Sequence, residues 1–330
     1  MNNLFEIKDY AVCYFDLMGQ REGLLRHVRE TSNLADVMPE VERVSKSIIS
    51  FNDAIYGAKL TIEREPDKLL RILNFAEEAI KPLVADIKKL DLGIQQFSDT
   101  TIFYVSTDNR IGLGIFTSWC LVLAANYLNM VSNGILIRGG IAIGRGWEIA
   151  PNCLYGPVME DVYRLEGLVA DFPRVVLSSK TYQSFKEVDD LDAEELRLQG
   201  VSPALMGLKC TDLFDKDFDG VYILDYLSLP AIRGFNRMWA MPKGQICSLI
   251  IKGLQYISTT SATLTEEAFK DITKANVARK IALLKSYWAQ RTEKICEMLN
   301  TAQENSTCNS DNAGSIGGAE NESKETSNQR

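Results

Sequence analysis

The chain has almost no histidine, no paired cysteines and fewer basic than acidic residues. It has a single histidine, His27, and its seven cysteines are widely spaced, with no Cys-x-x-Cys pair. These counts predict neither a zinc site nor a disulfide framework, and they favour a reducing cytosol. A net charge of −8 at pH 7 and a pI near 5.0 also argue against a nucleic-acid partner, because neutralising phosphates requires clustered Lys and Arg.

Targeting and membrane-spanning patterns are also lacking. The first ten residues show no basic-then-apolar signal pattern, so we expect a cytoplasmic protein. The most apolar window, Ile111–Val131, contains Asn126 and Asn129 and lacks paired Lys or Arg anchors at its two ends. This window therefore predicts a buried helix, and no direct membrane association is expected.

What the chain does have is material for a large core: 330 residues, 46% of them hydrophobic. A β-prone run, Tyr10–Asp16, ends on an acid, and apolar residues at helical spacing then continue to Leu90. Two further β-prone runs between Leu92 and Ser106 flank a turn at Ser98-Asp99. This order predicts a strand, a helical block near residues 20–90 and a hairpin.

The stretch Asn133–Ser179 predicts a strand-helix-strand unit. Its predicted parts are a strand at 135–143, a short return through Trp147 and Ile149, a turn at Gly156, a helix at 157–170 and a strand at 174–177. Glycine normally weakens a strand, so Gly139, Gly140, Gly144 and Gly146 indicate either close approach of a backbone or ligand, or a bulged hairpin.

The last third of the chain predicts helices around one further strand. The predicted elements are helices at 179–188, 189–199, 244–256 and 264–302 and a strand at 220–227, while 200–219 shows no clear motif. From Gln303 onwards the composition is Asn, Ser, Gly and Glu with almost no bulky residues, so residues 303–330 predict a disordered tail.

Three short motifs follow one another at fixed offsets: Arg-x-Gly-Ile (Arg138–Ile141), Cys-Leu-Tyr-Gly (Cys153–Gly156) and Arg-Leu-Glu (Arg164–Glu166). In this order they resemble the second half of a class III nucleotide cyclase domain. That family also has an aspartate at the end of its first strand and another in a hairpin turn, where this chain has Asp16 and Asp99. Together with FDLMGQ, QQFSD and YGPVMEDVYRLE, the motifs most resemble the bacterial pyrimidine cyclases of the Pycsar anti-phage systems.

The resemblance implies a metal and phosphate site. It makes Asp16 and Asp99 ligands of a pair of Mg²⁺ or Mn²⁺ ions, with the backbone carbonyl of Leu17 as a further ligand. The backbone near Gly19 and the side chain of Arg138 would contact the phosphates of a nucleoside triphosphate. Taken alone, Asp16 is equally consistent with a helix N-cap, Asp99 with an ordinary turn, and Arg138 with a surface salt bridge.

The same resemblance assigns roles to the predicted helix. Arg164 matches the catalytic arginine that stabilises the transition state, although a surface salt bridge is again the alternative. Glu160 occupies the ribose-binding position, where the family has asparagine. In the family, each site takes its metal ligands from one chain and its helix arginine from another, which implies a homodimer.

Base recognition is assigned to Gln95 and Cys153. The family has lysine at the first position in adenylate cyclases and glutamate in guanylate cyclases, whereas cysteine at the second is typical of guanylate cyclases. A neutral amide can donate and accept, so Gln95 suits uracil or cytosine. The implied reaction converts UTP, slightly favoured, or CTP to the 3′,5′-cyclic monophosphate and pyrophosphate, a messenger that activates a separate effector.

Three other functions stay open. They are a purine (guanylate or adenylate) cyclase, a catalytically silent cyclase-like sensor of nucleotides, and a structural helical protein. The fold expected is α+β: a ferredoxin-like antiparallel sheet over residues 1–302, with extra N-terminal and C-terminal helices.

Overall fold

The computed structural model describes residues 6–18, 33–67, 77–97, 100–107, 110–190, 209–232, 242–271 and 274–312. Its strands are β1 (Lys8–Met18), β2 (Leu92–Phe97), β3 (Thr100–Ser106), β4 (Leu136–Ala150), β5 (Cys153–Tyr155), β6 (Val175–Leu177), β7 (Phe214–Lys216) and β8 (Tyr222–Leu224). Its α-helices are α2 (Met38–Arg64), α4 (Glu77–Ile87), α5 (Arg110–Ser132), α6 (Pro157–Arg164), α7 (Ser179–Asp189), α10 (Lys243–Lys270) and α11 (Ala275–Asn312). Shorter helical turns are η1 (Leu34–Asp36), η2 (Leu165–Val169, a π-helical turn) and η3 (Cys210–Leu213).

One mostly antiparallel sheet organises these elements. The strand order is β2-β3-β1-β4-β6-β8-β7, and β1 pairs antiparallel with both β3 and β4. The first four strands, with α2 and α4 before β2 and α5 before β4, follow the ferredoxin-like βαββαβ order. The prediction of a wholly antiparallel sheet is wrong at one pair, because the crossover through α6 makes β6 parallel to β4.

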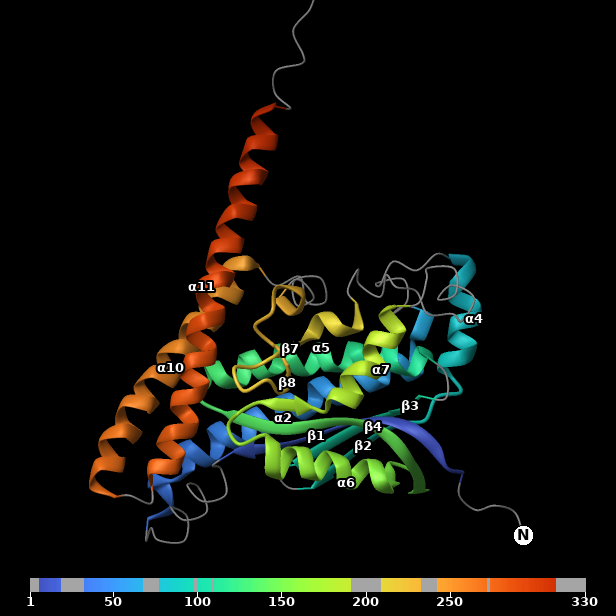
Figure 1. The fold of residues 1–330 in the computed structure, drawn as a ribbon, viewed down its shortest axis with the longest axis horizontal. Coiled ribbons are helices and arrows are strands. Elements are labelled where there is room, and N and C mark those ends of the chain that lie inside the picture. Colours follow the sequence, from blue (N-terminus) through green and yellow to red (C-terminus); the bar gives the residue numbers. More distant parts are fainter. Residues whose placement is uncertain are drawn as a thin grey trace, which may run out of the picture.

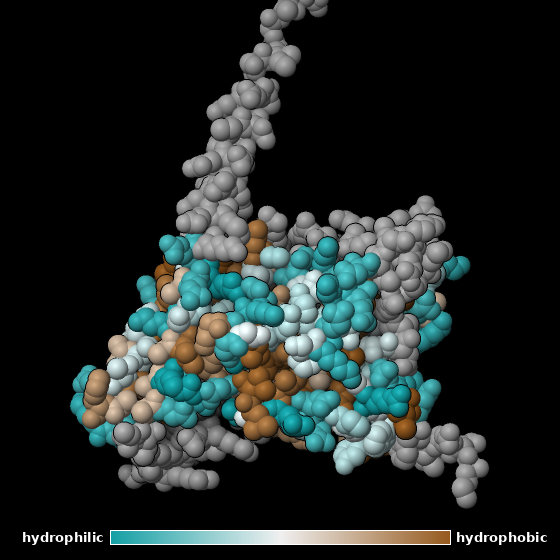
Figure 2. Space-filling model, in the orientation of Figure 1, coloured by the Kyte–Doolittle hydropathy of each residue, from teal (hydrophilic) through white to brown (hydrophobic). Residues whose placement is uncertain are grey.

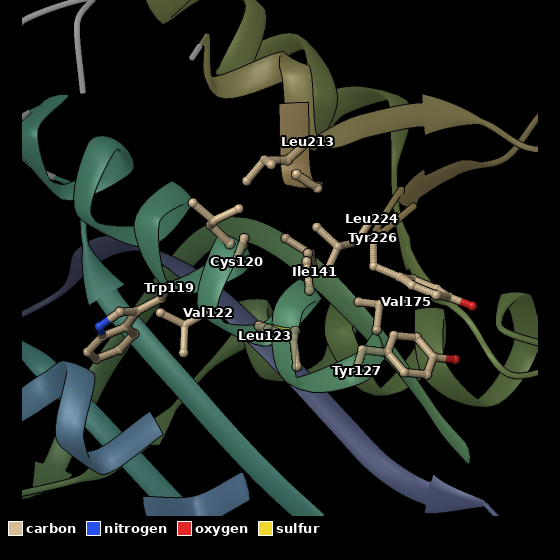
Figure 3. Packing of buried hydrophobic residues seen from close by; sticks show 14 of the residues in the cluster. Trp119, Cys120, Val122, Leu123, Tyr127, Ile141, Val175, Leu213, Leu224 and Tyr226 are labelled. Atoms are coloured by element: carbon tan, nitrogen blue, oxygen red, sulfur yellow. The ribbon is translucent and has the colours of Figure 1, made fainter. Parts of the chain in front are cut away.

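Helices cover both faces of the sheet, with α6 on one face and α5 on the other (Figure 1). On β1, Ala11, Cys13 and Phe15 belong to the larger core, which includes the buried residues of α5. Side chains of α5 also reach across to β4, β6 and β8 (Figure 3). By length and composition α5 is apolar enough to cross a membrane, but 83% of its most apolar window is buried inside the protein, as predicted for a core helix.

The α6 face owes its close packing to glycine. A Cβ on Gly140 would lie 2.6 Å from the carbonyl oxygen of Val162 and 2.8 Å from Cβ of Leu165. A Cβ on Gly144 would meet nothing closer than 3.6 Å. Of the two interpretations of the glycine run, close approach of another backbone is therefore confirmed at Gly140.

The return after the predicted strand 135–143 lies elsewhere than expected. Strand β4 continues through Trp147 to Ala150, and the chain turns at Asn152, whose φ is +58°, before returning as β5. Pairing between β4 and β5 shifts register between Glu148 and Ala150. Trp147 and Ile149 therefore belong to the outgoing strand, because the turn comes after them, at residues 151–152.

The C-terminal helices also differ from their predicted bounds. Helix α10 runs unbroken across 257–263, the stretch between the two predicted helices 244–256 and 264–302. Ile257 and Ser261 are buried there, and Thr265 Oγ1 donates to the carbonyl oxygen of Ser261, so packing overrides weak helix propensity. Helix α11 continues to Asn312, within the predicted tail 303–330, and it extends beyond the body of the protein (Figure 1).

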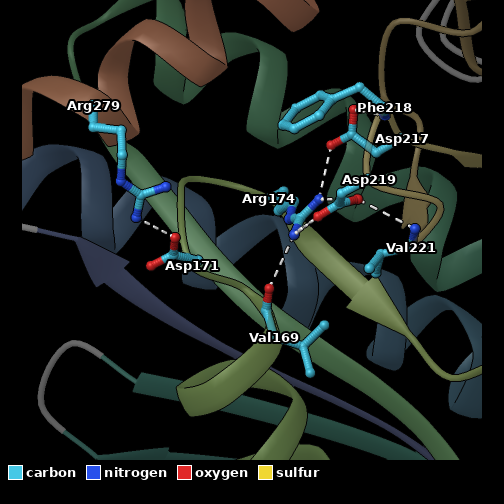
Figure 4. A network of polar contacts seen from close by, with 8 residues as sticks. All are labelled: Val169, Asp171, Arg174, Asp217, Phe218, Asp219, Val221 and Arg279. Atoms are coloured by element: carbon cyan, nitrogen blue, oxygen red, sulfur yellow. Dashed lines mark hydrogen bonds and ion pairs between the residues drawn. The ribbon is translucent and has the colours of Figure 1, made fainter. Parts of the chain in front are cut away.

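The predicted strand 220–227 is shorter than expected, and η3 and β7 lie in the stretch without a motif. Strand β8 starts only at Tyr222 because Gly220 turns the chain with φ +81°. This hairpin is tied to the start of β6 by Arg174, whose guanidinium donates to Asp217 at 2.9 Å and to Asp219 at 2.6 Å (Figure 4). A buried ion-pair network therefore fixes the sheet extension.

Candidate functional site

Asp16 and Arg138 meet on the two central strands. They are register partners in the β1–β4 ladder, and Asp16 also pairs with Thr100, the first residue of β3. Strand alternation puts Asp16 on the same face as Val12 and Tyr14, which is the face covered by α6. The hydroxyl of Thr100 donates to Asp16 Oδ1 at 3.0 Å.

Arg138 is paired with an acid from the helix side. Its Nε lies 2.5 Å from Oε1 of Glu166, which comes from η2, and Glu166 is only 7% exposed. Burial raises the pKa of Glu166, the positive charge of Arg138 lowers it, and the negative charge of Asp16 raises it, with a net upward shift. Burial is also the main reason that the pKa of Tyr14 rises to about 12. Arg138 therefore forms a partly buried ion pair, and its binding to phosphates stays a prediction.

Arg164 faces away from this cluster. Val158 and Val162 point from α6 into the sheet, whereas Glu160 and Arg164 are exposed on its outer side. Both line a cavity of about 680 Å³ together with Trp147, and Arg164 also lines a second cavity of about 390 Å³. Among the described residues, the guanidinium of Arg164 has no ion-pair partner, and neither cavity is lined by Asp16 or Arg138.

Apolar side chains surround the exposed arginine. Leu168, 76% exposed, lines both cavities, and Tyr155 and Tyr163 are also largely exposed beside the larger one. Figure 2 shows a cluster of apolar side chains in the lower middle of the face it presents. The outer side of α6 therefore combines apolar surface with a cation.

Gln95 and Cys153 are brought into one region by the β4–β5 turn. Oδ1 of Asn152 accepts a hydrogen bond from the backbone nitrogen of Ile94 at 3.2 Å, which ties the turn to β2. Gln95 follows Ile94 and is 7% exposed, and Cys153 follows Asn152 and is half-buried. The hydrogen bond thus joins the neighbours of these two residues, a link that depends on the turn and that their sequence spacing did not show.

Tyr104 and Glu148 lie in the same region. The Tyr104 hydroxyl donates to the Glu148 carboxylate, and the Tyr104 ring covers Gly93 of β2. Burial and the neighbouring Glu148 hold the pKa of Tyr104 well above its usual value. Sequence reasoning missed this pair because neither residue belongs to a recognisable motif.

No protein-family model matches the chain, and no curated protein sequence matches it. Among solved structures, the chain is similar to the adenylyl cyclase CyaB from P. aeruginosa, with a TM-score of 0.36 and 13% sequence identity over 56% of this chain and 83% of that chain. We therefore base the functional proposal on the site residues and the strand order.

Two of the predicted site residues, Gly19 and Asp99, lie outside the described residues. Leu17 packs its side chain into the α5-side core, so only its backbone is available to a ligand. The ladder between β1 and β3 ends at Asp16, whereas the ladder with β4 continues to Met18. Asp16 therefore stands where β1 leaves its β3 neighbour.

The donor atoms in the described part of the site are of the kind that a hard cation prefers. Asp16 offers carboxylate oxygen and Leu17 a carbonyl oxygen, which are the donors that Mg²⁺ and Mn²⁺ prefer. Within the described ranges no cluster of three or more His, Cys, Asp or Glu side chains is placed to hold a metal ion. A site there would depend on Asp99 as the second carboxylate.

Glu166 and Thr100 are the contacting residues to which the sequence assigned no role. Glu166 stands inside the Arg-Leu-Glu motif, so its signal was present, but its target on β4 was not visible. Thr100 directly follows the predicted hairpin turn. Both contacts join segments far apart in the chain.

Proposed function

We propose that the protein is a nucleotide cyclase that joins the 3′-oxygen of a nucleoside triphosphate to its own α-phosphorus and releases pyrophosphate. The observation that carries the proposal is the placement of Asp16 and Arg138 as partners on the central strands, with the family motifs around them. Since nucleophile and electrophile belong to one molecule, positioning and charge neutralisation account for most of the catalysis. Asp16 and Arg138 supply a negative and a positive group on one surface.

The proposed metal ions would be held by Asp16, the Leu17 carbonyl and Asp99. When bound, Mg²⁺ or Mn²⁺ lowers the pKa of the attacking hydroxyl and offsets phosphate charge. Arg138 would bind the terminal phosphates, and Arg164 would stabilise charge that develops at the α-phosphorus. The proton of the 3′-hydroxyl leaves to solvent as the new P–O bond forms and the bond to pyrophosphate breaks.

A homodimer is part of this proposal. Arg164 and Asp16 lie on opposite sides of α6, so one chain does not bring both to one substrate. A second copy would supply the missing arginine and would cover the apolar side chains around it, including Leu168 and Tyr155. The chain provides one set of each group, so such a dimer has a pair of equivalent sites.

The substrate proposed is a pyrimidine nucleotide, UTP in preference to CTP. The support is Gln95, a neutral amide that is placed near Cys153 by the Asn152 turn. The cyclic product would act in the bacterial cytoplasm as a messenger of anti-phage defence, read by a separate effector. These finer assignments follow the sequence motifs.

A silent nucleotide sensor is the second candidate. Glu160 is exposed and lines the larger cavity with Arg164, so it brings a negative charge to the place where phosphate is expected. Such a charge opposes stabilisation of the transition state more than it opposes distant binding of a base. A sensor would bind nucleotide and release no pyrophosphate.

The test is to incubate the purified protein separately with ATP, GTP, CTP and UTP and Mn²⁺, and to identify cyclic products by mass spectrometry. A single pyrimidine product, reduced about 100-fold or more by Asp16→Asn, is expected. Asp9→Asn is the matched control, because Asp9 is an exposed aspartate on the same strand. Undiminished product from Asp16→Asn would refute the site, and a purine product alone would refute the pyrimidine assignment.

Mixing two inactive variants tests the shared site. Asp16→Asn and Arg164→Ala damage different groups, and a heterodimer of the two retains one intact site. An equal mixture, with random pairing, should recover about a quarter of the wild-type activity. Absence of recovery from two folded, exchanging dimers would show that each site is built from one chain.

A further inference from the structure

We propose that Glu166 is a positioning residue, which holds Arg138 by its Nε so that the terminal nitrogens of the guanidinium point at the phosphates of a bound nucleotide. This role rests on the proposed function and deepens it. The sequence motifs assign Arg138 to the phosphates, but they do not identify the residue that orients its guanidinium.

The first support is the pair itself. Nε of Arg138 lies 2.5 Å from Oε1 of Glu166, and the arginine side chain retains 29% of its exposure while the glutamate side chain retains 10%. Glu166 is the only ion-pair partner of Arg138 among the described residues. The contact is an ion pair, since neither Arg138 Nε nor Glu166 Oε1 has a hydrogen-bond partner in the described part of the chain. The Nε end of the guanidinium therefore lies against a buried carboxylate, and the exposed part of the side chain can meet an anion.

The second support is the rigidity of the backbone that carries Glu166. A Cβ on Gly140 would lie 3.2 Å from the backbone nitrogen of Glu166, so β4 and η2 are in close contact. Tyr163, on the preceding turn, packs edge-on against Tyr14 with ring centroids 4.8 Å apart. The segment that carries Glu166 is thus fixed to β1 and β4, the two strands that carry Asp16 and Arg138.

The third support comes from the alternative partner of Arg138. On the same face, its register partner is Asp16, and the negative charge of Asp16 is already felt by Glu166. Without Glu166, Arg138 would turn to Asp16 and neutralise it, since a cation near a carboxylate gains from pairing. Glu166 therefore draws the guanidinium of Arg138 away from the carboxylate of Asp16.

The burial of the ion pair between Glu166 and Arg138 indicates a functional role. A buried charge is costly and needs a partner, and a pair of apolar residues would serve packing equally well. Tethering one end of an arginine reduces the entropy that it loses when it binds an anion. The arrangement therefore favours binding of phosphates over packing as its role.

The experiment measures binding of inorganic tripolyphosphate to the full chain by titration calorimetry, without a base or sugar. Wild type is compared with Glu166→Ala, Arg138→Ala and the double variant. Glu166→Ala should weaken binding about tenfold, and Arg138→Ala should weaken it at least as much. In the double variant, loss of Glu166 should cost nothing further, because Glu166 acts through Arg138.

Controls separate positioning from general damage. Glu187→Ala removes an exposed glutamate of α7 and should bind like wild type. Glu166→Gln removes the charge but retains side-chain volume and a polar oxygen beside Nε, so it should weaken binding less than Glu166→Ala. If Glu166→Ala does not fold by circular dichroism, Glu166→Gln alone and combined with Arg138→Ala gives the same comparison.

The outcomes separate the two proposals. Wild-type binding by the Glu166 variants, additive losses in the double variant, or no tripolyphosphate binding by wild type would each overturn the role of Glu166. Coupled losses in a protein that forms no cyclic nucleotide would support Glu166 and refute the cyclase. A cyclic product together with uncoupled losses would support the cyclase and refute the role of Glu166.

Discussion

Replacing Gly140 with alanine tests the close contact between β4 and the helix that carries Arg164. The added Cβ would lie 2.6 Å from the Val162 carbonyl oxygen and 2.8 Å from Cβ of Leu165. Neither neighbour is the end of a flexible side chain, so α6 and η2 must move away from the sheet. Gly144→Ala is the control, because its Cβ would meet Val158 at an ordinary 3.6 Å.

The expected magnitudes follow from two opposing effects. Overpacking of a tight contact costs about 1–3 kcal/mol. Replacing glycine by alanine also restricts the unfolded chain, which stabilises the folded state by about 0.4–1 kcal/mol where the backbone conformation suits alanine. Gly140→Ala should therefore lower the free energy of unfolding by about 1–2 kcal/mol, and Gly144→Ala should leave it unchanged or raise it slightly.

Urea denaturation followed by circular dichroism measures both variants. A lower midpoint at unchanged slope for Gly140→Ala, with no decrease for Gly144→Ala, is the expected result. Because the displaced segment carries Glu166, Gly140→Ala should also weaken tripolyphosphate binding. Equal stability of the two variants would refute the close contact and the arrangement of Arg138 and Glu166 that depends on it.

Three further predictions concern the polar contacts that fix the C-terminal half. Arg174→Ala leaves Asp217 buried without its cation and should lower the free energy of unfolding by about 3–5 kcal/mol, whereas Asp217→Asn together with Arg174→Met should cost less in the same denaturation assay. Tyr287→Phe removes a 2.7 Å hydrogen bond to the buried carboxylate of Asp225 and should cost about 1–2 kcal/mol, so an unchanged denaturation midpoint would contradict this contact. The hydrogen bond from Arg174 holds the pKa of Asp219 below its usual 3.8. The ionised Asp219 therefore stabilises the folded protein above pH 3.8, and this stabilisation is lost as the pH falls below that value. In an acid titration, the free energy of unfolding should decrease less steeply for Asp219→Asn than for wild type.

Local pattern was sufficient for most of the first half of the fold. Strand alternation in β1 separates Phe15, on the α5 side, from Tyr14 and Asp16, on the α6 side. The apolar run of α5 predicted a core helix, and the turn at Ser98-Asp99 predicted the pairing of β2 with β3. These elements depend on residues close together in the chain, so local sequence patterns predict them.

Elements whose limits depend on distant contacts were predicted less well. Helix α10 continues through a Ser- and Thr-rich stretch because Ile257 and Ser261 are buried against other helices. β4 continues to Ala150, beyond the predicted strand, where it pairs with β5 and where Glu148 accepts a hydrogen bond from Tyr104 of β3. The helix or strand propensity of a residue contributes little free energy, and burial of side chains contributes more at these positions.

The sequence by itself determined which chemical groups the protein possesses: an acid that ends the first strand, arginines on a strand and a helix, and glycines between them. Only the tertiary structure decided how they are arranged. It pairs Arg138 with Glu166, turns Arg164 outward, and places Gln95 near Cys153 through Asn152. The sequence gives the type of each side chain. The direction in which a side chain points and the residue it pairs with depend on packing between segments far apart in the sequence. Buried charges need partners, and tight contacts leave no room for a Cβ atom, so one arrangement is selected.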